Sequence, residues 1–107
     1  MKLKNQAESF KEFVIDQCGA SPELFCRPMF GGHGLYQGDI FFGIIHKGRL
    51  YFKTNAFTRV DYAAYDMMPF TPNETQTLKN YLEVPVSILE DSTALRLWAK
   101  KAVAVSL

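Results

Sequence analysis

The chain has 107 residues, of which 48% are hydrophobic and 14% aromatic. This length is typical of one domain with its own core, and this aromatic content excludes a disordered segment. With 12 Lys and Arg against 11 Asp and Glu, the net charge is only +1, which disfavours a domain that binds nucleic acid through a general basic excess. No apolar run approaches the ~20 residues of a membrane-spanning helix, and no secretory signal opens the chain. We therefore expect one soluble domain over residues 1–107, in the cytoplasm, with Cys18 and Cys26 reduced.

The first predicted element is an amphipathic helix over residues 4–18. Its apolar stripe follows helical spacing through Ala7, Phe10, Val14 and Cys18, and Phe13 widens it. Gly19 is a natural helix end, because glycine adopts the left-handed conformation at little cost.

Next along the chain, the branched and aromatic residues that favour strands gather in four runs. These runs are residues 24–29, 35–37, 39–46 and 49–54. Pro28 has no N–H donor, so the first run is expected to be an edge strand or an interrupted one. The Gly-Gly-His-Gly segment at residues 31–34 is expected to form a turn or bulge. The glycine-containing turns between the runs favour an antiparallel meander.

The second half alternates helix and strand. Asn55 is expected to cap a helix over residues 56–65. Its inner face would hold Phe57, Val60 and Ala64. Residues 68–73 carry two prolines and are expected to be extended.

Residues 77–84 follow as a strand with period-two alternation. One side would hold Leu78, Asn80, Leu82 and Val84, and the other Lys79, Tyr81 and Glu83. Pro85 then suits the first turn of a short helix, because its missing N–H costs nothing there.

The last predicted helix starts at Asp91 and Ser92, where a cap and a negative charge are both favourable. We expect Glu90 and Asp91 to serve the helix start rather than acid–base catalysis. The inner face of this helix would consist of Leu95, Trp98, Ala99 and Ala102. Because helices and strands are segregated along the chain, an α+β fold with helices packed on an antiparallel sheet is favoured over a doubly wound α/β fold.

The sequence contains only weak signals for a catalytic or metal site. The glycines at residues 31–34 lack the following Lys and helix of a phosphate-binding loop, so a structural turn is the better interpretation. His33 and His46 are the only histidines and lie near no cysteine in sequence, whereas metal sites usually need three or four ligands with a short-spaced pair. Cys18 lies on an apolar stripe and is expected to be inert. We expect no catalytic residue, no metal and no cofactor.

The strand over residues 49–54 carries the best binding pattern. Alternation places Arg49, Tyr51 and Lys53 on one face, with Leu50 and Phe52 on the other. Cations interleaved with an aromatic ring can hold phosphates and stack bases, although an ordinary solvated sheet face has the same pattern. The candidate interaction surface consists of Arg27, Tyr36, Lys47, Arg49, Tyr51 and Lys53, with Arg59 as a further candidate.

Several motifs together resemble one known family. Residues 27–36 read Arg-Pro-Met-Phe-Gly-Gly-His-Gly-Leu-Tyr and resemble the Arg-x-Met-Phe-Gly-Gly-x-Gly-Leu-Tyr signature of the TfoX/Sxy N-terminal domain. Residues 48–54, the Pro69-Phe70 pair, residues 81–85 and the Leu95-x-x-Trp98 pattern follow in the family order. The signature residues expected to be structural are Met29, Phe30, Gly31, Gly32, Gly34, Pro69, Phe70, Pro85 and Trp98.

The resemblance implies a bent antiparallel sheet in the order α–β–β–β–(β)–α–β–α, with the helices on one face. It also implies a bacterial regulator of competence-gene expression and DNA transformation that acts with the cAMP receptor protein, without enzymatic activity or cofactor. Full-length TfoX proteins carry a second, helical domain, which we do not expect within these 107 residues. Asn55 and Asp66 depart from the usual family pattern, and Asp66 is expected to alter a turn.

The leading hypothesis is therefore an adaptor domain that regulates transcription through protein–protein contacts. The alternative is direct nucleic-acid binding through the basic and aromatic sheet face. Exposed strand edges leave a homodimer open as well.

Overall fold

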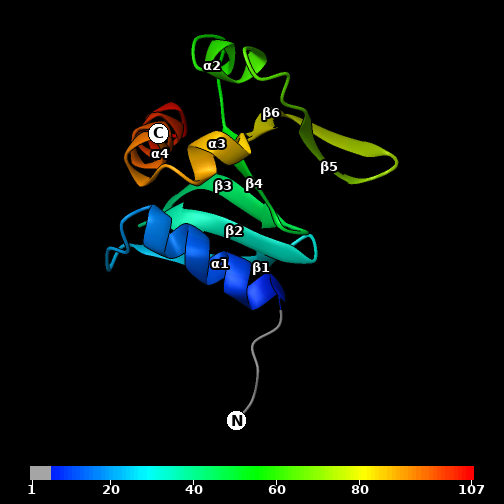
Figure 1. Cartoon of the computed structure of the whole chain (residues 1–107). Helices are drawn as coiled ribbons and strands as arrows, with labels where there is room; N and C mark the ends of the chain where they lie inside the picture. The colour runs from blue at the N-terminus through cyan, green and yellow to red at the C-terminus, as the bar shows by residue number, and fades with distance from the viewer. Residues whose placement is uncertain (1–5) are drawn as a thin grey trace.

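The computed structural model describes residues 6–107, apart from the side chain of Ala7 (Figure 1). The predicted helix start at residues 4–5 and the place of Ala7 in its stripe lie outside the described part. In chain order the elements are α1 (Gln6–Gln17), β1 (Leu24–Met29), β2 (Gly32–Gln37), β3 (Ile40–His46), β4 (Arg49–Lys53), α2 (Arg59–Ala63), β5 (Pro69–Asn73), β6 (Gln76–Glu83), α3 (Val86–Leu89) and α4 (Ser92–Val105).

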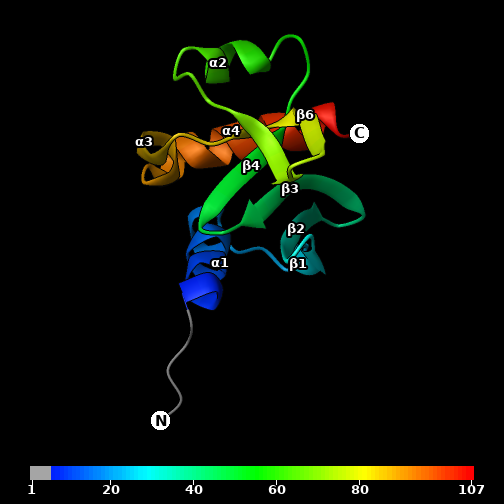
Figure 2. The same cartoon turned by 90° about the vertical axis from the view of Figure 1, so that its right-hand side faces the viewer.

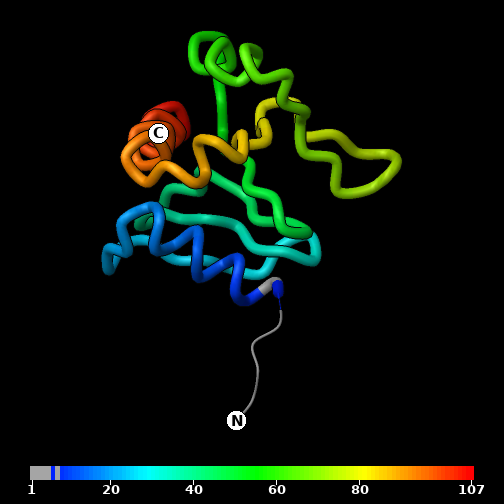
Figure 3. Tube along the Cα trace, in the orientation of Figure 1, coloured from blue at the N-terminus to red at the C-terminus, as the bar shows by residue number. Residues whose placement is uncertain are grey.

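Within residues 6–107 the strands form one six-stranded sheet in the order β1-β2-β3-β4-β6-β5. Every neighbouring pair is antiparallel. The first four strands make the predicted meander, and β1, which contains Pro28, lies at an edge as predicted. Between β4 and β5 the chain leaves the sheet through α2, which stands at the far end of the molecule from α1 (Figures 2 and 3). The structure therefore confirms an α+β fold.

One face of the sheet is covered by helices. Its core joins strand residues such as Leu35 and Phe52 to Val14 of α1, Leu89 of α3 and Leu95 of α4. The cap of α4 forms as predicted, because Asp91 Oδ1 accepts a hydrogen bond from the Ala94 N–H at 3.1 Å. We call this side the covered face.

The opposite side of the sheet, which we call the open face, carries a second cluster. Its buried members are Ile44, Tyr51 and Phe70. Half-buried Met29, Phe41, Leu78 and Tyr81 pack against them, and all of these residues belong to strands.

The helix predicted over residues 56–65 is shorter, and the prediction that Phe57, Val60 and Ala64 form its inner face is wrong, because all three are exposed. The helix begins only at Arg59, so Phe57 falls in the preceding turn and is 87% exposed. Val60 is exposed as well, and the side chain that points inward is Tyr62, whose ring lies 4.6 Å from that of Trp98. Asn55 does cap this turn, because its Oδ1 accepts hydrogen bonds from the N–H groups of Phe57 and Thr58.

Three smaller predictions need correction. Phe13 does not widen the buried stripe of α1, since it is exposed. Of the glycine segment, only Gly31 lies in the turn, next to Phe30; their φ angles are 79° and 53°, and β2 already begins at Gly32. The alternation predicted for residues 77–84 breaks, because a shift in register with β5 brings Leu78 onto the same face as Tyr81.

Gly32 shows why this segment needs glycine. A Cβ atom placed there would collide with the carbonyl oxygen of Ile45 on the neighbouring strand. The backbone approach of β2 to β3 is therefore possible only without a side chain.

Candidate interaction surface

The open face carries four aromatic rings in a continuous row, which we call the aromatic row: Phe25, Tyr36, Phe41 and Tyr81. Successive ring centroids are 5.4, 5.3 and 5.4 Å apart. The sheet register produces this order, since Phe25 and Phe41 are the direct neighbours of Tyr36 on either side. All four rings are half-buried.

Two cations lie on this row. The Arg27 guanidinium is 5.4 Å from the Phe25 ring centre and 5.3 Å from that of Tyr36. At the other end the Lys53 ammonium is 5.0 Å from the ring centre of Tyr81, its partner across β4 and β6. These distances are those of cation–π contacts. Arg27, Tyr36 and Lys53 of the predicted surface are therefore brought together.

A glycine makes room for the row. At Gly34, which pairs with Arg27 across β1 and β2, a Cβ atom would come within 3.0 Å of the Phe41 ring and 3.2 Å of the Tyr36 ring. A side chain at this position would displace both rings. This signature glycine therefore shapes the surface that it adjoins.

The remaining predicted members differ in accessibility. Arg49 is exposed but forms an ion pair with Glu83, with 3.0 Å between Nη1 and Oε1. Tyr51 lies on the predicted face but is only 8% exposed, because Phe70 packs on it at 4.9 Å between ring centres. Burial first, and then the Glu83 carboxylate, raise the pKa of Tyr51. Tyr51 is therefore a buried support of the surface rather than a contact residue.

The two other cations lie at the margin. Lys47 is exposed in the turn between β3 and β4, where its φ is 49°. Arg59 is exposed on α2, outside the sheet. Neither has a ring contact among those recorded for residues 6–107.

Sequence reasoning missed Phe25, Phe41 and Tyr81. The place of Phe25 on this face could have been predicted, because it lies two residues from Arg27 in one strand and must share its face. Phe41 was hidden by the irregular register between Leu35 and Tyr36, where β2 and β3 are out of simple alternation. The position of Tyr81 depends on the pairing of β4 with β6, which are distant in sequence.

The other signature residues have structural positions. Phe70 is fully buried, and the Phe30 ring lies 5.5 Å from it. Pro85 is buried directly before α3. Met29 packs on the open-face cluster, and Pro69 pairs with Leu82 at the start of β5.

The nucleophile and metal candidates have ordinary surroundings. Burial raises the pKa of the Cys18 thiol to about 12 and also raises that of Cys26, so both free thiols stay protonated at neutral pH. Burial is the main cause that lowers the pKa of His33 and of His46. In the described part of the chain, no three His, Cys, Asp or Glu side chains gather as metal ligands. None of its helices is long and apolar enough to cross a membrane.

A comparison with known families decides the classification. The model of the family described as the TfoX N-terminal domain matches residues 16–106. The chain belongs to this family. The match includes every strand of the sheet, and with it the whole aromatic row of this TfoX N-terminal domain. No curated protein matches the chain.

Proposed function

We propose that this TfoX N-terminal domain is a non-enzymatic regulatory domain that acts in transcription by binding a partner protein through the open face of its sheet. The observation that carries the proposal is the aromatic row with its two cations, on a face whose recorded cluster contains strand residues only. Aromatic rings and arginine are the residue types that dominate protein interfaces. Family membership supports the regulatory role.

The charges on this face favour an acidic and partly apolar partner segment. Arg27 is exposed, and neither it nor Lys53 takes part in the ion pairs recorded within residues 6–107. Lys47 adds a third cation at the margin. Glu83 does not offset them, because Arg49 already neutralises it. An acidic segment with apolar side chains would match both the cations and the ring edges.

The strand edges are a poorer contact site than the face. Both edge strands contain proline, with Pro28 in β1 and Pro69 and Pro72 in β5. Proline offers no N–H to an added strand. Dimerisation through paired edges is therefore disfavoured, and the face is the surface to test.

Direct nucleic-acid binding is the second candidate, and the cations on the aromatic row are the observation in its favour. Base stacking needs free ring faces, however. Phe25 and Tyr36 stack on each other with only 10° between their planes, and cations lie over Phe25, Tyr36 and Tyr81. For these reasons, and because the net charge is only +1, we favour protein binding over nucleic-acid binding.

The test compares two double variants. Arg27→Gln with Tyr36→Ala alters the open face, whereas Leu97→Ala with Arg59→Gln removes an exposed apolar side chain and a cation elsewhere. The first partner to measure is the purified cAMP receptor protein, which the family resemblance names. Pull-downs from the native cytoplasm, with and without nuclease, extend the test to other partners.

We expect the open-face variant to lose binding by about tenfold or more, since central aromatic and arginine contacts dominate interface energy. The control variant should bind as the wild type does. Equal binding by both variants, or no partner retained in either experiment, contradicts the proposal. A partner lost on nuclease treatment, with a gel shift that weakens with salt and disappears in the open-face variant, would favour the nucleic-acid alternative.

A further inference from the structure

A pocket lies on the covered side of the sheet, away from the aromatic row. It has a volume of about 490 Å³ and lies between α4, the carboxyl end of α1 and the sheet. Pockets that bind small molecules have volumes of about 300–1,000 Å³. Its apolar wall is formed by Leu24 of β1, Phe42 of β3, and Ala99 and Val103 of α4.

The α4 side of the pocket is both apolar and cationic. Arg96, Ala99, Lys100 and Val103 all line it, and their spacing of three, four and seven residues places them on one helix face. Ala99 is buried, whereas Arg96 and Lys100 are exposed. The pocket therefore has an apolar interior with two cations towards solvent.

Within residues 6–107, the structure shows no ion pair between either of these two cations and a carboxylate. The ion pairs recorded within residues 6–107 include Lys101, the neighbour of Lys100, but neither Lys100 nor Arg96. Arg96 is held in place through its Nε, which donates to the carbonyl oxygen of Gln17 at 3.2 Å. This contact at the end of α1 leaves the two Nη groups of Arg96 for a ligand.

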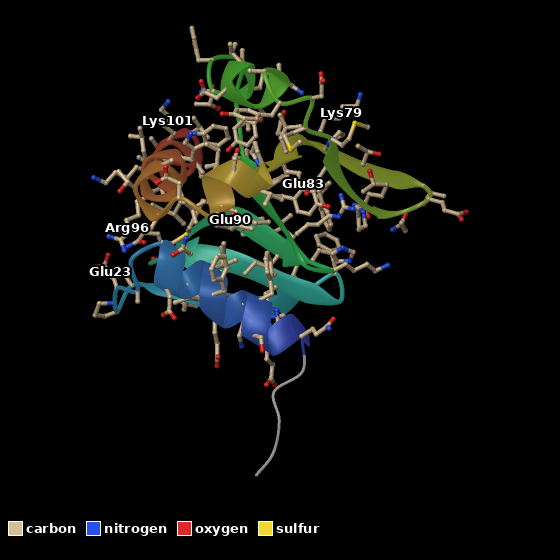
Figure 4. The ribbon with its side chains drawn as sticks, in the orientation of Figure 1. Glu23, Lys79, Glu83, Glu90, Arg96 and Lys101 are labelled. Carbon is tan, nitrogen blue, oxygen red and sulfur yellow. The ribbon has the colours of Figure 1, made fainter. Side chains whose placement is uncertain are left out.

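One carboxylate beside the pocket, that of Glu23, is already engaged by a lining residue. Glu23 Oε2 accepts a hydrogen bond at 3.1 Å from Nε2 of Gln37, which lines the pocket. Figure 4 shows Arg96 and Glu23 on the same side of the molecule, coming from α4 and from the segment before β1. Cys18, also in the wall, is protonated at neutral pH and adds no negative charge.

We propose that this pocket binds a small amphipathic carboxylate non-covalently, with the carboxylate at Arg96 and Lys100 and the apolar body against Leu24 and Val103, beneath which Phe42 is fully buried. A planar guanidinium and an ammonium group match a carboxylate, and the apolar wall excludes water from the rest of the ligand. The inference is independent of the proposed function, because the pocket and the open face lie on opposite sides of the sheet.

The test follows the binding of decanoate to the whole chain by amide NMR. Decanol and acetate are the matched control compounds. Decanol keeps the apolar chain without the carboxylate, and acetate keeps the carboxylate without the apolar chain. We expect saturable decanoate shifts at Cys18, Gly19, Gln37 and Val103. Decanol and acetate should bind at least about tenfold more weakly, because each loses either the charge-assisted contacts or the apolar burial.

Two variants locate the site. Lys100→Gln removes an exposed cation without touching the core, and Ala99→Leu fills the pocket. Each should weaken decanoate binding, whereas Lys47→Gln on the other side should leave it unchanged. The proposal is overturned if decanoate gives no saturable shifts, if the shifts centre on Phe57 and Val60, or if Lys100→Gln binds decanoate as tightly as the wild type.

Discussion

The two faces of the sheet differ in which side chains cover them. On the covered face, side chains from α1, α2, α3 and α4 bury the strand residues in one large cluster. On the open face, strand residues pack on each other, and the rings stay half-buried beneath Arg27 and Lys53. Alternating residues of the same strands serve both faces, as Phe52 and Lys53 do. We therefore expect the covered face to contribute most of the stability, and the open face is the one that we propose as the contact surface.

Phe52→Ala and Phe41→Ala test this division most directly. Phe52 is fully buried on the covered face, so its loss should lower the free energy of unfolding by about 3–5 kcal/mol. Phe41 is half-buried in the aromatic row, and its loss should cost about 1–2 kcal/mol. Urea unfolding measures both. Equal losses would mean that the open face is as much a core as the covered face.

Gly32→Ala probes the backbone that joins β2 to β3. The new methyl group would collide with the carbonyl oxygen of Ile45, a clash that we expect to cost about 1–3 kcal/mol. Gly38→Ala is the control, because its methyl group meets open space and the cost comes only from a φ of 61°, about 1 kcal/mol. Thermal unfolding of both variants ranks them. A smaller loss for Gly32→Ala than for Gly38→Ala would refute the close approach.

Asp91→Ala tests how α4 is held over the covered face. The variant loses the hydrogen bond that Asp91 accepts from the Ala94 N–H, and we expect a loss of about 1 kcal/mol. Asp91→Asn keeps an acceptor oxygen and should be nearly neutral. Helix content by circular dichroism and urea unfolding check both. A large loss for Asp91→Asn would show that charge rather than the cap matters.

The smallest expected effect is a pH dependence on the open face. His46 packs edge-on to Phe70, with 5.1 Å between the ring centres. Burial is the main cause that lowers the pKa of His46 below 6.5, and the positive charge of Lys47 is the second cause. The unfolded chain therefore takes up a proton more readily than the folded chain, so stability falls as the pH drops through about 6.5. His46→Gln should flatten the unfolding free energy between about pH 7.5 and 5.5. The pKa of His33 is also lowered, so His33 makes a separate contribution of the same sign, which remains in the His46→Gln variant. An unchanged slope in His46→Gln would contradict this assignment.

Local patterns accounted for much of the fold. The cap at Asp91, the buried stripe of Leu95, Ala99 and Ala102, and the edge position of the strand with Pro28 all follow from neighbouring residues. The region around α2 could not be predicted in this way. Phe57 and Val60 have the pattern of a buried face, but only contact with Trp98 selects Tyr62 instead.

The sequence by itself determined the fold class, the meander and the face shared by Arg49, Tyr51 and Lys53, because spacing along one element depends on local geometry. Only the tertiary structure decided which of these residues is accessible. Phe70, from a strand distant in sequence, covers Tyr51, and the register of β1, β2 and β3 aligns Phe25, Tyr36 and Phe41. Register and strand order depend on contacts between distant segments, which no local pattern contains.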